Sequence, residues 1–591
     1  MQPSSLLNEL LEKRGITTAE QKEIFLNPNY ERDMHDPFLM RDMEKACVRI
    51  FEAMEAGEKI LVYADYDCDG IPGAVILNDF FNKLNYKNFE VYIPQRNSEG
   101  YGLNLEMVKK MDADGVKLLI TIDLGITAVA EVAQAIVYGI DVIITDHHIP
   151  HAELPRAYAI LNPKVDEYSE KMLCGSGVVF KLVQGFLKKY GGAGIVFPLP
   201  AELATLRQSS ATENTIPAPL SWEKWLLDMA GLATLSDMVP LLGENRVIAY
   251  FGLKVFRKSP RPGLQKLLAK MSIDQKYISE DDIGFMVTPR LNAASRMDDP
   301  RRAFELLATQ DETEAGILAN HLTKINDERK KMVAGIMKDV NKKFEKREMN
   351  EVIVIGHPEW KVGVLGLVAG KICDEHKKPV FVWGKDENDF IKGSCRSDGS
   401  VSVVELMTET REYFLEFGGH EGAGGFTVHT EKVHFLEEAL SSSFVNIRAK
   451  SAGDIFSLPA ELATLRQSSA TEKQSPTLFD LKLSLTDVNM KNWKEIEKMA
   501  PFGCENPKPI FLFENVKIEK LKKFGKNNSQ EHLEIIFSDN NKKATAISFF
   551  SGLDSFKIPL AEGLSVNLLA TFDLSRFRGR EELRLRIVDI M

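Results

Sequence analysis

Acidic residues recur at alternate positions in the stretch LVYADYDCDGIPG, residues 61–73. Asp65, Asp67 and Asp69 follow an apolar run directly, and alternate residues of an extended segment share one face. Their carboxylates would repel one another unless a cation lies between them. The first chemistry that the sequence predicts is therefore the binding of a metal ion.

Three further groups could complete such a site. Asp123 follows the run KLLITI, Asp146, His147 and His148 follow DVIIT, and Asp237 lies in LATLSDMVPLLGENR. Mixed carboxylate and imidazole ligands suit Mn²⁺, with Mg²⁺ as the alternative. A carboxylate-rich set can hold two ions about 3.5–4 Å apart for in-line attack on phosphorus, with one ion activating water and both stabilising the oxyanions.

Each group has a simpler explanation when taken alone. A D-x-D-x-D-G string opens an EF-hand loop, but that loop needs Glu at its twelfth position, where this chain has Ile76, and a helix before it. Asp123 could cap a helix, His147 and His148 could be loop residues, and Asp237 could be a turn residue. Helix capping can explain a single aspartate, but it does not explain acidic clusters after three successive strands. The groups taken together therefore favour metal chemistry.

The elements that position these residues alternate from about residue 58 to 148. The apolar runs KILVYA, FEVYIP, VKLLITID and DVIITD are separated by helix-favouring stretches such as GAVILNDFFNKLN and AVAEVAQAIVYG. This alternation predicts a parallel sheet covered by helices. The acidic residues then fall at the carboxyl ends of strands, where open α/β sheets hold their ligands.

The rest of the chain predicts three further parts. Residues 301–348 are charged and helix-favouring, which indicates a long helix between two lobes. EVIVIGH and PVFVWG open a second α/β lobe, and short strands with polar turns from about residue 475 predict a small β-barrel.

Composition limits the class of protein. The chain has 591 residues, of which 44% are hydrophobic and 27% charged, and no apolar stretch approaches the ~20 residues that span a bilayer. Six scattered cysteines without a CxxC pair indicate neither a zinc cluster nor a disulfide framework, so we expect a cytoplasmic protein. The net charge of -11 argues against non-specific coating of nucleic acid but permits a local basic groove.

One segment occurs twice. LPAELATLRQSSATE stands at residues 199–213 and again, letter for letter, at 458–472. Structural repeats keep a pattern while their letters diverge, so identity in two unlike contexts indicates copied insertions in surface positions. The first copy precedes Asp237, where a badly placed insertion could distort that ligand.

The motifs resemble those of a known family. DYDCDG, TIDLGI, TDHH and LSDMVPL resemble, in this order, the motifs of the DHH phosphoesterase superfamily. YIPQRNSEGYGL, TPRLNAASRM, KGSCRS, FGGHEGAGGF and APFGCENPKPIF are similar to the RecJ family of bacterial exonucleases, which degrade single-stranded DNA 5′→3′. The resemblance covers most of residues 45–591 outside the copied segments. One departure is Ser295, where the family usually has glycine.

The resemblance implies roles for individual residues. It makes the metal ligands Asp67, Asp69, Asp123, His147 and Asp237. Asp65 and Asp146 match positions that either bind metal or orient a ligand, and His148 matches the histidine that contacts the scissile phosphate, so these three form the expected catalytic group. The residues that match substrate-binding segments are Arg96, Tyr101, Arg290, Asn292, Arg296, Arg396, Ser397, Gly418, Gly419 and His420.

The expected fold is α/β, with two α/β lobes (DHH and DHHA1) joined by a long helix and a C-terminal OB-like β-barrel. The expected parts are an N-terminal helical segment (1–44), the DHH domain (45–300, insertion about 193–213), the connecting helix (301–348), the DHHA1 domain (349–450), a linker with the second copy (451–474) and the OB-like domain (475–591).

We expect a metal-dependent exonuclease that degrades single-stranded DNA 5′→3′ to 5′-mononucleotides in DNA repair and recombination, with Mn²⁺ or Mg²⁺ in a two-metal site. The resemblance implies a monomer without membrane association, and a helicase and a single-strand-binding protein as partners. One alternative is a DHH-family short-oligonucleotide or cyclic-dinucleotide phosphodiesterase, although such enzymes resemble only the DHH and DHHA1 parts. Another is a non-catalytic DNA-replication scaffold, which loss of metal ligands would mark.

Overall fold

The computed structural model describes residues 5–96, 99–165, 167–191, 222–345, 347–457, 479–524, 532–539, 542–549, 552–576 and 581–591. Both copies of the repeated segment lie outside these residues. The chain divides into two compact units. The α/β unit comprises His35–Asp237 and Phe251–Ser469, and the barrel unit comprises Met1–Met34, Met238–Tyr250 and Ala470–Met591.

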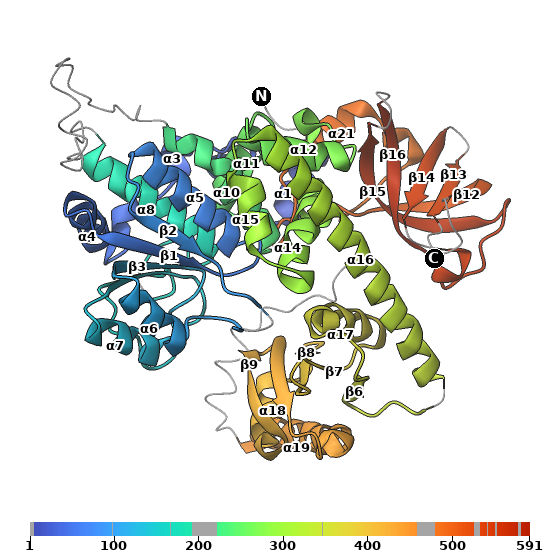
Figure 1. Ribbon diagram of the computed structural model, residues 1–591. Helices are drawn as coiled ribbons and strands as arrows, with labels where there is room; N and C mark the ends of the chain where they lie inside the picture. The colour runs from blue at the N-terminus through green and yellow to red at the C-terminus, as the bar shows by residue number, and fades with distance from the viewer. Residues whose placement is uncertain are drawn as a thin grey trace. The chain divides into compact units, whose positions relative to one another are not determined.

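A five-stranded parallel sheet forms the first lobe of the α/β unit. Its order is β2-β1-β3-β4-β5, with β1 (Lys59–Ala64), β2 (Phe89–Tyr92), β3 (Val116–Ile122), β4 (Asp141–Thr145) and β5 (Ala159–Leu161). Helices cover both faces (Figure 1): α6 (Leu105–Ala113) and α7 (Val129–Val137) on one, and α4 (Met43–Glu55), α5 (Gly70–Lys83) and α8 (Gly175–Tyr190) on the other. The predicted parallel α/β sheet is confirmed.

The burial of both faces explains why these strands are continuous apolar runs. In β1, every residue from Ile60 to Ala64 is buried, and in β3 every residue from Leu118 to Ile122 is buried. A strand covered by helices on both sides cannot alternate apolar and polar residues, because each side chain meets a packed layer. The first acidic side chains after these buried runs therefore appear where the strands end.

Helices follow the sheet toward the second lobe. They are α10 (Leu227–Ser236), α11 (Gly243–Phe256), α12 (Pro262–Lys270), α13 (Glu280–Asp282), the π-helical turn η5 (Ile283–Val287), α14 (Thr288–Met297), α15 (Arg301–Ala308) and α16 (Glu312–Phe344). The region predicted as one long helix thus contains two. The break falls at Asp311, whose side chain accepts hydrogen bonds from the first backbone N–H groups of α16 and caps it.

The second lobe has a mixed sheet of order β6-β7-β8-β10-β9. Its elements are β6 (Ile353–Gly356), α17 (Val362–His376), β7 (Val380–Lys385), β8 (Ile391–Arg396), α18 (Val403–Glu409), β9 (Phe414–His420), β10 (Ala423–Val428) and α19 (Leu436–Ser457). β6 and β7 are parallel, and the other neighbours are antiparallel. The predicted second α/β lobe is confirmed.

The barrel unit contains β11 (Leu481–Lys482), α21 (Met490–Glu497), β12 (Phe511–Phe524), β13 (His532–Ser538), β14 (Lys543–Ser548), β15 (Ser565–Ser575) and β16 (Glu582–Ile590). The order β12-β13-β14-β16-β15 closes through a direct β12–β15 pairing, which gives the predicted OB-like barrel. The N-terminal helices α1 (Ser5–Lys13) and α2 (Ala19–Leu26) belong to this unit. Leu7, Leu10, Leu11 and Phe25 are buried in the same core as the barrel strands.

Candidate metal centre

The acidic residues continue the strands of the first sheet. The backbone N–H groups of Asp65, Asp123 and Asp146 each donate to a carbonyl of the neighbouring strand, at 2.9 to 3.1 Å. These three positions follow β1, β3 and β4 directly, so the sheet register sets them side by side at one edge. The predicted placement of acidic residues at strand ends is therefore what the fold produces.

His147 lies among three carboxylates. Its Nε2 is 3.1 Å from Oδ1 of Asp123, 3.7 Å from Oδ2 of Asp69 and 3.7 Å from Oδ2 of Asp237. Asp237 follows α10 directly and caps its C-terminus, so a residue distant in sequence completes the group. Burial lowers the pKa of His147, which favours the neutral imidazole that can bind a metal ion.

A second group adjoins the first. Ligand atoms of Asp65, Asp67 and Asp123 lie within 4.8 Å of one another, as do those of Asp69, His147 and Asp237. The 3.1 Å contact between Asp123 and His147 joins the two groups. Two adjacent sets of oxygen and imidazole ligands are the arrangement that a pair of divalent cations requires.

The electrostatics of the residues fit a cation. Oδ1 of Asp65 and Oδ1 of Asp123 are buried and accept no hydrogen bond from the residues that the structure describes. Burial, followed by the neighbouring carboxylates, raises the pKa of both groups well above the ordinary value and that of Asp237 to about 9. Divalent cations would offset this repulsion, and hard oxygen ligands with one imidazole suit Mn²⁺ or Mg²⁺.

Helix α8 holds Asp69 in place. The carboxylate of Asp69 accepts hydrogen bonds from the backbone N–H groups of Gly175 at 2.6 Å and Ser176 at 2.7 Å. A Cβ on Gly175 would lie 2.7 Å from the Cβ of Asp123, and one on Gly70 would lie 2.4 Å from the carbonyl oxygen of Asp65. These two glycines let the backbone approach the carboxylates closely, which explains the glycine that ends DYDCDG.

Asp146 faces His148 rather than the carboxylates. One oxygen of Asp146 accepts from the backbone N–H of Ile126 at 2.9 Å, and the other lies 2.8 Å from Nδ1 of His148. Burial opposes ionisation, but the bonds from His148 and the backbone keep the pKa of Asp146 below its usual value. Burial likewise acts to lower the pKa of His148, yet the bond to Asp146 raises it overall. Asp146 thus orients His148.

Tyr101 and Arg96 lie beside this pair. The hydroxyl of Tyr101 donates to the carbonyl oxygen of Asp123 at 3.1 Å and lies 3.4 Å from Nδ1 of His148, while 54% of the residue is exposed. The guanidinium of Arg96 lies 5.0 Å from the ring centroid of Tyr66. Tyr101 is thus an exposed aromatic side chain at the edge of the carboxylate cluster.

Sequence reasoning missed Lys164. Its ammonium donates to the carbonyl oxygen of His147, and burial lowers its pKa while Asp146, Asp237 and Asp123 oppose that shift. The lysine stands in the loop after β5, in the stretch LNPKV, which carries no pattern of its own. Only the sheet topology brings it to the carboxylates.

A group of arginines adjoins the acidic cluster. Arg296 of α14 is half-buried, and its pKa falls to about 9, first through desolvation and then through the positive charges of Arg96, Arg329 and Arg396. Arg396 of β8 lies against α17, where a Cβ on Gly366 would be 3.2 Å from its Nη2. Three predicted substrate-binding arginines are thus brought together, and Arg329 joins them without having been predicted.

The remaining predicted residues divide into two groups. His420 is largely exposed, and partial desolvation followed by the positive charges of Arg396 and His148 lowers its pKa, so it lies near the arginines. Gly418 and Gly419 pair with Gly425 and Gly424 of β10. A Cβ on Gly419 would meet the Ala423 carbonyl at 2.3 Å, so close strand packing is sufficient to explain that glycine.

The last three predicted positions are Ser397, Arg290 and Asn292. Ser397 donates to the carbonyl oxygen of Val401 at 2.5 Å and shapes its own loop. Arg290 and Asn292 of α14 each carry a buried polar atom without a hydrogen bond to the residues that the structure describes. Ser295, which departs from the family pattern, donates to the carbonyl of Asn292 at 3.3 Å within the same helix.

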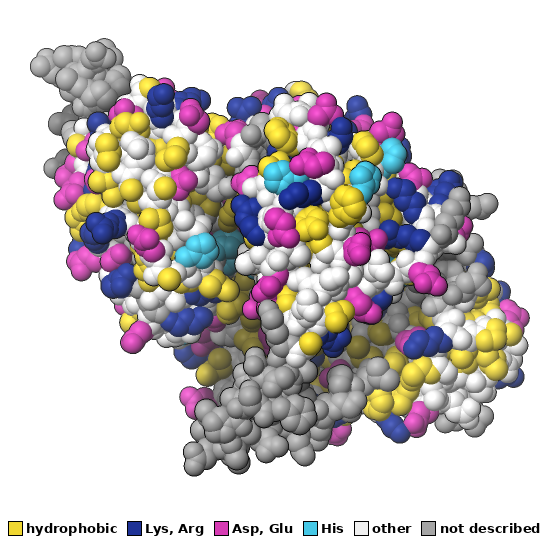
Figure 2. Space-filling view, turned by 90° about the horizontal axis from the view of Figure 1, so that it is seen from below, with side chains coloured by type: hydrophobic (Ala, Val, Ile, Leu, Met, Phe, Trp, Pro, Cys, Tyr) yellow, Lys and Arg dark blue, Asp and Glu magenta, His cyan; other side chains and the backbone are white. Residues whose placement is uncertain are grey.

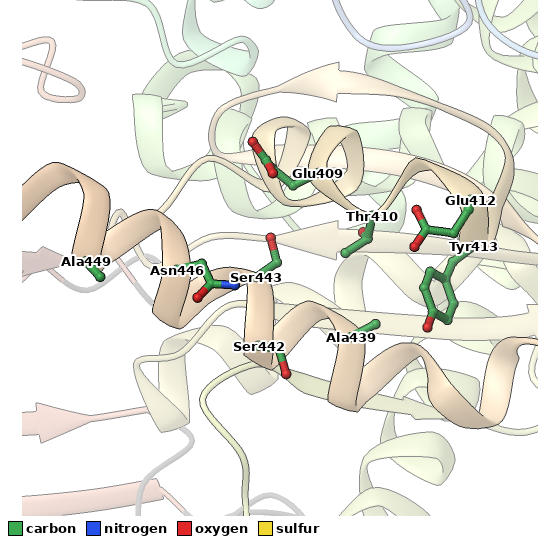
Figure 3. A pocket seen from close by; sticks show the side chains of 9 residues that line it. All are labelled: Glu409, Thr410, Glu412, Tyr413, Ala439, Ser442, Ser443, Asn446 and Ala449. Atoms are coloured by element: carbon green, nitrogen blue, oxygen red, sulfur yellow. The ribbon is translucent and has the colours of Figure 1, made fainter.

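A pocket of about 490 Å³ in the second lobe is separate from these residues (Figure 3). It lies between α19 and the end of α18, and Glu409, Glu412 and Tyr413 line it together with small residues. None of the predicted site residues borders it. The metal centre is therefore the stronger functional candidate.

Comparisons with known proteins agree with the geometry. Models described as "DHH family, N-terminal domain", "DHHA1 domain" and "RecJ OB domain" match residues 59–208, 349–446 and 479–589. The single-stranded-DNA-specific exonuclease RecJ of Bacillus subtilis is 33% identical over 588 residues, which cover 99% of this chain and 67% of that protein. The chain belongs to the RecJ family.

Other members of the RecJ family match over most of their length. The RecJ exonuclease of Escherichia coli is 28% identical over 600 residues, covering 99% of this chain and 95% of that protein. A crystal structure of Thermus thermophilus RecJ in complex with Mn²⁺ shares the fold, with a TM-score of 0.75, 23% identity and coverage of 99% of this chain and 76% of that one. Among the residues that the structure describes, no helix is long and apolar enough to span a membrane.

Proposed function

We propose that this RecJ-family chain hydrolyses single-stranded DNA from the 5′ end and releases 5′-mononucleotides. The observation that carries the proposal is the convergence of Asp69, Asp123 and Asp237 on His147, beside a buried oxygen of Asp65 that accepts no hydrogen bond from the described residues. The printed names of the relatives, which describe exonucleases specific for single-stranded DNA, support the substrate.

We assign two divalent ions, Mn²⁺ or Mg²⁺, to the carboxylate cluster. Asp67, Asp69, Asp123, His147 and Asp237 would hold them, with Asp65 as a further ligand or as support. Such ions supply a water-derived nucleophile at neutral pH and stabilise the oxygens of an in-line displacement. A solved RecJ structure of 28% identity and TM-score 0.58, which is bound to manganese, supports this assignment.

The chain's own residues would position the substrate. His148, oriented by Asp146 and kept protonated more readily than an ordinary histidine, would donate a hydrogen bond to an oxygen of the scissile phosphate. Tyr101, held by its bond to the carbonyl of Asp123, would stack on a base at the 5′ end. Both groups would act beside the metal ligands.

The arginine group would bind phosphate. Arg96, Arg296 and Arg396 carry three positive charges close together, and a guanidinium offers a planar fork that matches a phosphate. On the face shown in Figure 2, basic and acidic side chains are interspersed. The OB-like barrel would add stacking contacts to the strand.

The rival functions have less support. A short-oligonucleotide phosphodiesterase has no need of the barrel that the RecJ OB model matches. A non-catalytic scaffold has no need of an intact ligand set, and here all the expected ligand residues are present and close together. From the family resemblance we also propose a cytoplasmic monomer that acts in DNA repair and recombination with a helicase and a single-strand-binding protein.

The test is digestion of a 5′-labelled single strand, a 3′-labelled one and a blunt duplex, with Mn²⁺ or Mg²⁺. We expect early release of labelled mononucleotide only from the 5′-labelled strand, loss of this activity in Asp123→Ala, and no change in Asp112→Ala, whose side chain is exposed on α6. Inactivity with both metals would favour the scaffold, and cleavage confined to very short oligonucleotides would favour the rival phosphodiesterase.

A further inference from the structure

The loop that carries the two histidines is held by the loop that follows β5. The backbone N–H groups of His147 and His148 both donate to Oδ1 of Asp146, at 2.7 and 3.0 Å. The carbonyl oxygen of His147 accepts from the ammonium of Lys164, and that of His148 accepts from Nδ2 of Asn162 at 3.0 Å. The backbone polar groups of both histidines are therefore all bound, and side chains bind all of them.

The peptide group between the two histidines is held on both sides. Its N–H belongs to His148 and donates to Asp146, whereas its carbonyl oxygen belongs to His147 and accepts from Lys164. A peptide group is planar, so bonds at its two opposite edges fix its orientation. The bond from Lys164 thus adds to what Asp146 does, because Asp146 binds only N–H groups of this backbone.

Asn162 holds the next peptide group from a rigid position. It is fully buried and follows β5 directly. Its Oδ1 accepts from the backbone N–H of Lys164 at 2.9 Å, and its carbonyl oxygen accepts from the N–H of Val165 at 3.0 Å. An asparagine that bonds the backbone two residues further on stabilises a turn, so the same side chain closes its own loop and reaches His148.

The two imidazoles that these bonds support reach different parts of the site. Nε2 of His147 lies 3.1 Å from Oδ1 of Asp123, inside the group of candidate metal ligands. Nδ1 of His148 lies 2.8 Å from Asp146. A shift of the peptide that Lys164 binds would move both imidazoles, whereas a shift of the peptide that Asn162 binds, which follows His148, would move His148 first.

We infer that Lys164 and Asn162 are positioning residues of this site: Lys164 sets the affinity for metal through the backbone of His147, and Asn162 sets turnover through the backbone of His148. Both act through peptide groups, so neither side chain has to touch the metal or the DNA. Groups that orient metal ligands in this way commonly change metal affinity or activity about 10- to 100-fold when they are removed. The inference rests on the proposed function, in which His147 binds metal and His148 binds the scissile phosphate.

The test measures the affinity for Mn²⁺ by titration calorimetry, and kcat and KM on a 5′-phosphorylated single strand at saturating Mn²⁺. Lys164→Met keeps an unbranched apolar side chain and removes the ammonium. Asn162→Ser keeps an oxygen that can accept from the backbone two residues on, but it is too short to reach His148. Lys117→Met is the matched control, because Lys117 is exposed on β3. The melting temperature in EDTA shows that each variant is folded.

We expect Lys164→Met to weaken Mn²⁺ binding about tenfold and to lower kcat as well. Lys164→Arg should recover most of the affinity, because it again offers a cationic donor to the carbonyl of His147. Asn162→Ser should bind Mn²⁺ as wild type does and lower kcat about tenfold, with KM little changed because the arginines are untouched. Lys117→Met should match wild type in every readout.

Wild-type affinity for Mn²⁺ in Lys164→Met would overturn the role of Lys164, and wild-type kcat in Asn162→Ser would overturn that of Asn162. Equal losses of metal affinity in the two variants would also overturn the inference, because they would indicate a general loosening of the loop. A wild type that neither binds Mn²⁺ nor degrades a single strand would instead contradict the proposed function, and the inference would fall with it.

Discussion

At the scale of single residues, the aspartates of the metal centre have pKa values that are shifted in opposite directions. Asp65, Asp123 and Asp237 each have a pKa raised by burial and by neighbouring carboxylates, whereas Asp146, only one residue from His147, has a lowered pKa. The difference follows from hydrogen bonding, because Asp146 accepts several donors and faces His148. At one edge of the sheet, Asp146 therefore orients a histidine, whereas the aspartates with raised pKa values form the carboxylate cluster.

The raised pKa values predict how the metal-free protein responds to pH. A carboxyl whose pKa is raised from 3.8 to about 9, as at Asp237, binds more protons in the folded state than in the unfolded state. The free energy of unfolding should therefore fall as pH rises through this window. We expect the melting temperature in EDTA to be lower at pH 8.5 than at pH 6.

Asp237→Asn is the matching variant. It removes one repelling carboxylate, so its melting temperature in EDTA should fall less between pH 6 and pH 8.5 than that of wild type. Added Mn²⁺ should stabilise wild type in proportion to the logarithm of its concentration and stabilise the variant less. If the melting temperatures of wild type and Asp237→Asn in EDTA fell equally between pH 6 and pH 8.5, this account of Asp237 would be contradicted.

Asp146 should affect turnover through His148. Asp146→Ala removes the acceptor that orients the imidazole and favours its protonated form, so we expect kcat to fall about 10- to 100-fold. KM should change less, because the arginines that bind phosphate are untouched. Asp146→Asn keeps an acceptor oxygen and should retain more activity than Asp146→Ala. Wild-type turnover in both variants would show that His148 needs no such support.

At the scale of elements, helix α8 and the loop after β3 must approach closely. A Cβ on Gly175 would lie 2.7 Å from the Cβ of Asp123, whereas one on Gly177 would lie 3.6 Å from its nearest neighbour, an ordinary contact. We expect Gly175→Ala to weaken Mn²⁺ binding, measured by calorimetry, about tenfold or more, because it displaces Asp123. Gly177→Ala, in the same helical turn, should bind Mn²⁺ as wild type does, and equal effects of the two substitutions would refute the steric argument.

Helices and strands were predicted well where the pattern of apolar residues in the sequence is strong. The strands that carry Asp65, Asp123 and Asp146 are continuous apolar runs, and their burial on both faces makes that signal unambiguous. The separation of α15 from α16 escaped prediction, because a charged helical run conceals a capping aspartate such as Asp311. The region before Asp237 falls partly outside the described residues, so the effect of the first copied segment there stays a prediction.

The candidate site was predicted less evenly than the fold. The carboxylates and histidines of the metal centre stand in short motifs whose residue types reveal their chemistry. Arg329 and Lys164 stand in ordinary charged or loop sequence, and only tertiary packing brings them to the site. Ser397 and Gly419 matched family motifs, yet their local contacts are also explained by loop and strand geometry. Sequence motifs thus identify reactive groups better than supporting ones.

At the scale of the whole molecule, the barrel unit is assembled from distant segments of the chain. Met1–Met34 and Met238–Tyr250 belong to it together with Ala470–Met591. Arg246 joins all three, since its guanidinium donates to the carbonyl oxygens of Phe25 at 2.9 Å and Ala500 at 3.0 Å. The sequence gives little indication of this, because a short amphipathic helix does not specify its partner.

This assembly predicts the outcome of truncation. Removing residues 475–591 would expose the apolar side chains of Leu7, Leu10, Leu11 and Phe25, which are buried against the barrel core, and would leave Arg246 without two of its acceptors. Exposed apolar surface of this kind favours association. We therefore expect the fragment 1–474 to bind the dye ANS and to aggregate in light scattering.

The matched fragment 35–474 lacks the N-terminal helices as well. It should bind less ANS and aggregate less than fragment 1–474, because the apolar faces of α1 and α2 are absent. Its carboxylate cluster belongs to the α/β unit, so Mn²⁺ should still raise its melting temperature. Suppose instead that fragment 1–474 binds no more ANS and aggregates no more than fragment 35–474. The N-terminal helices would then be stable without the barrel, and the core that they share with it would contribute little to their folding.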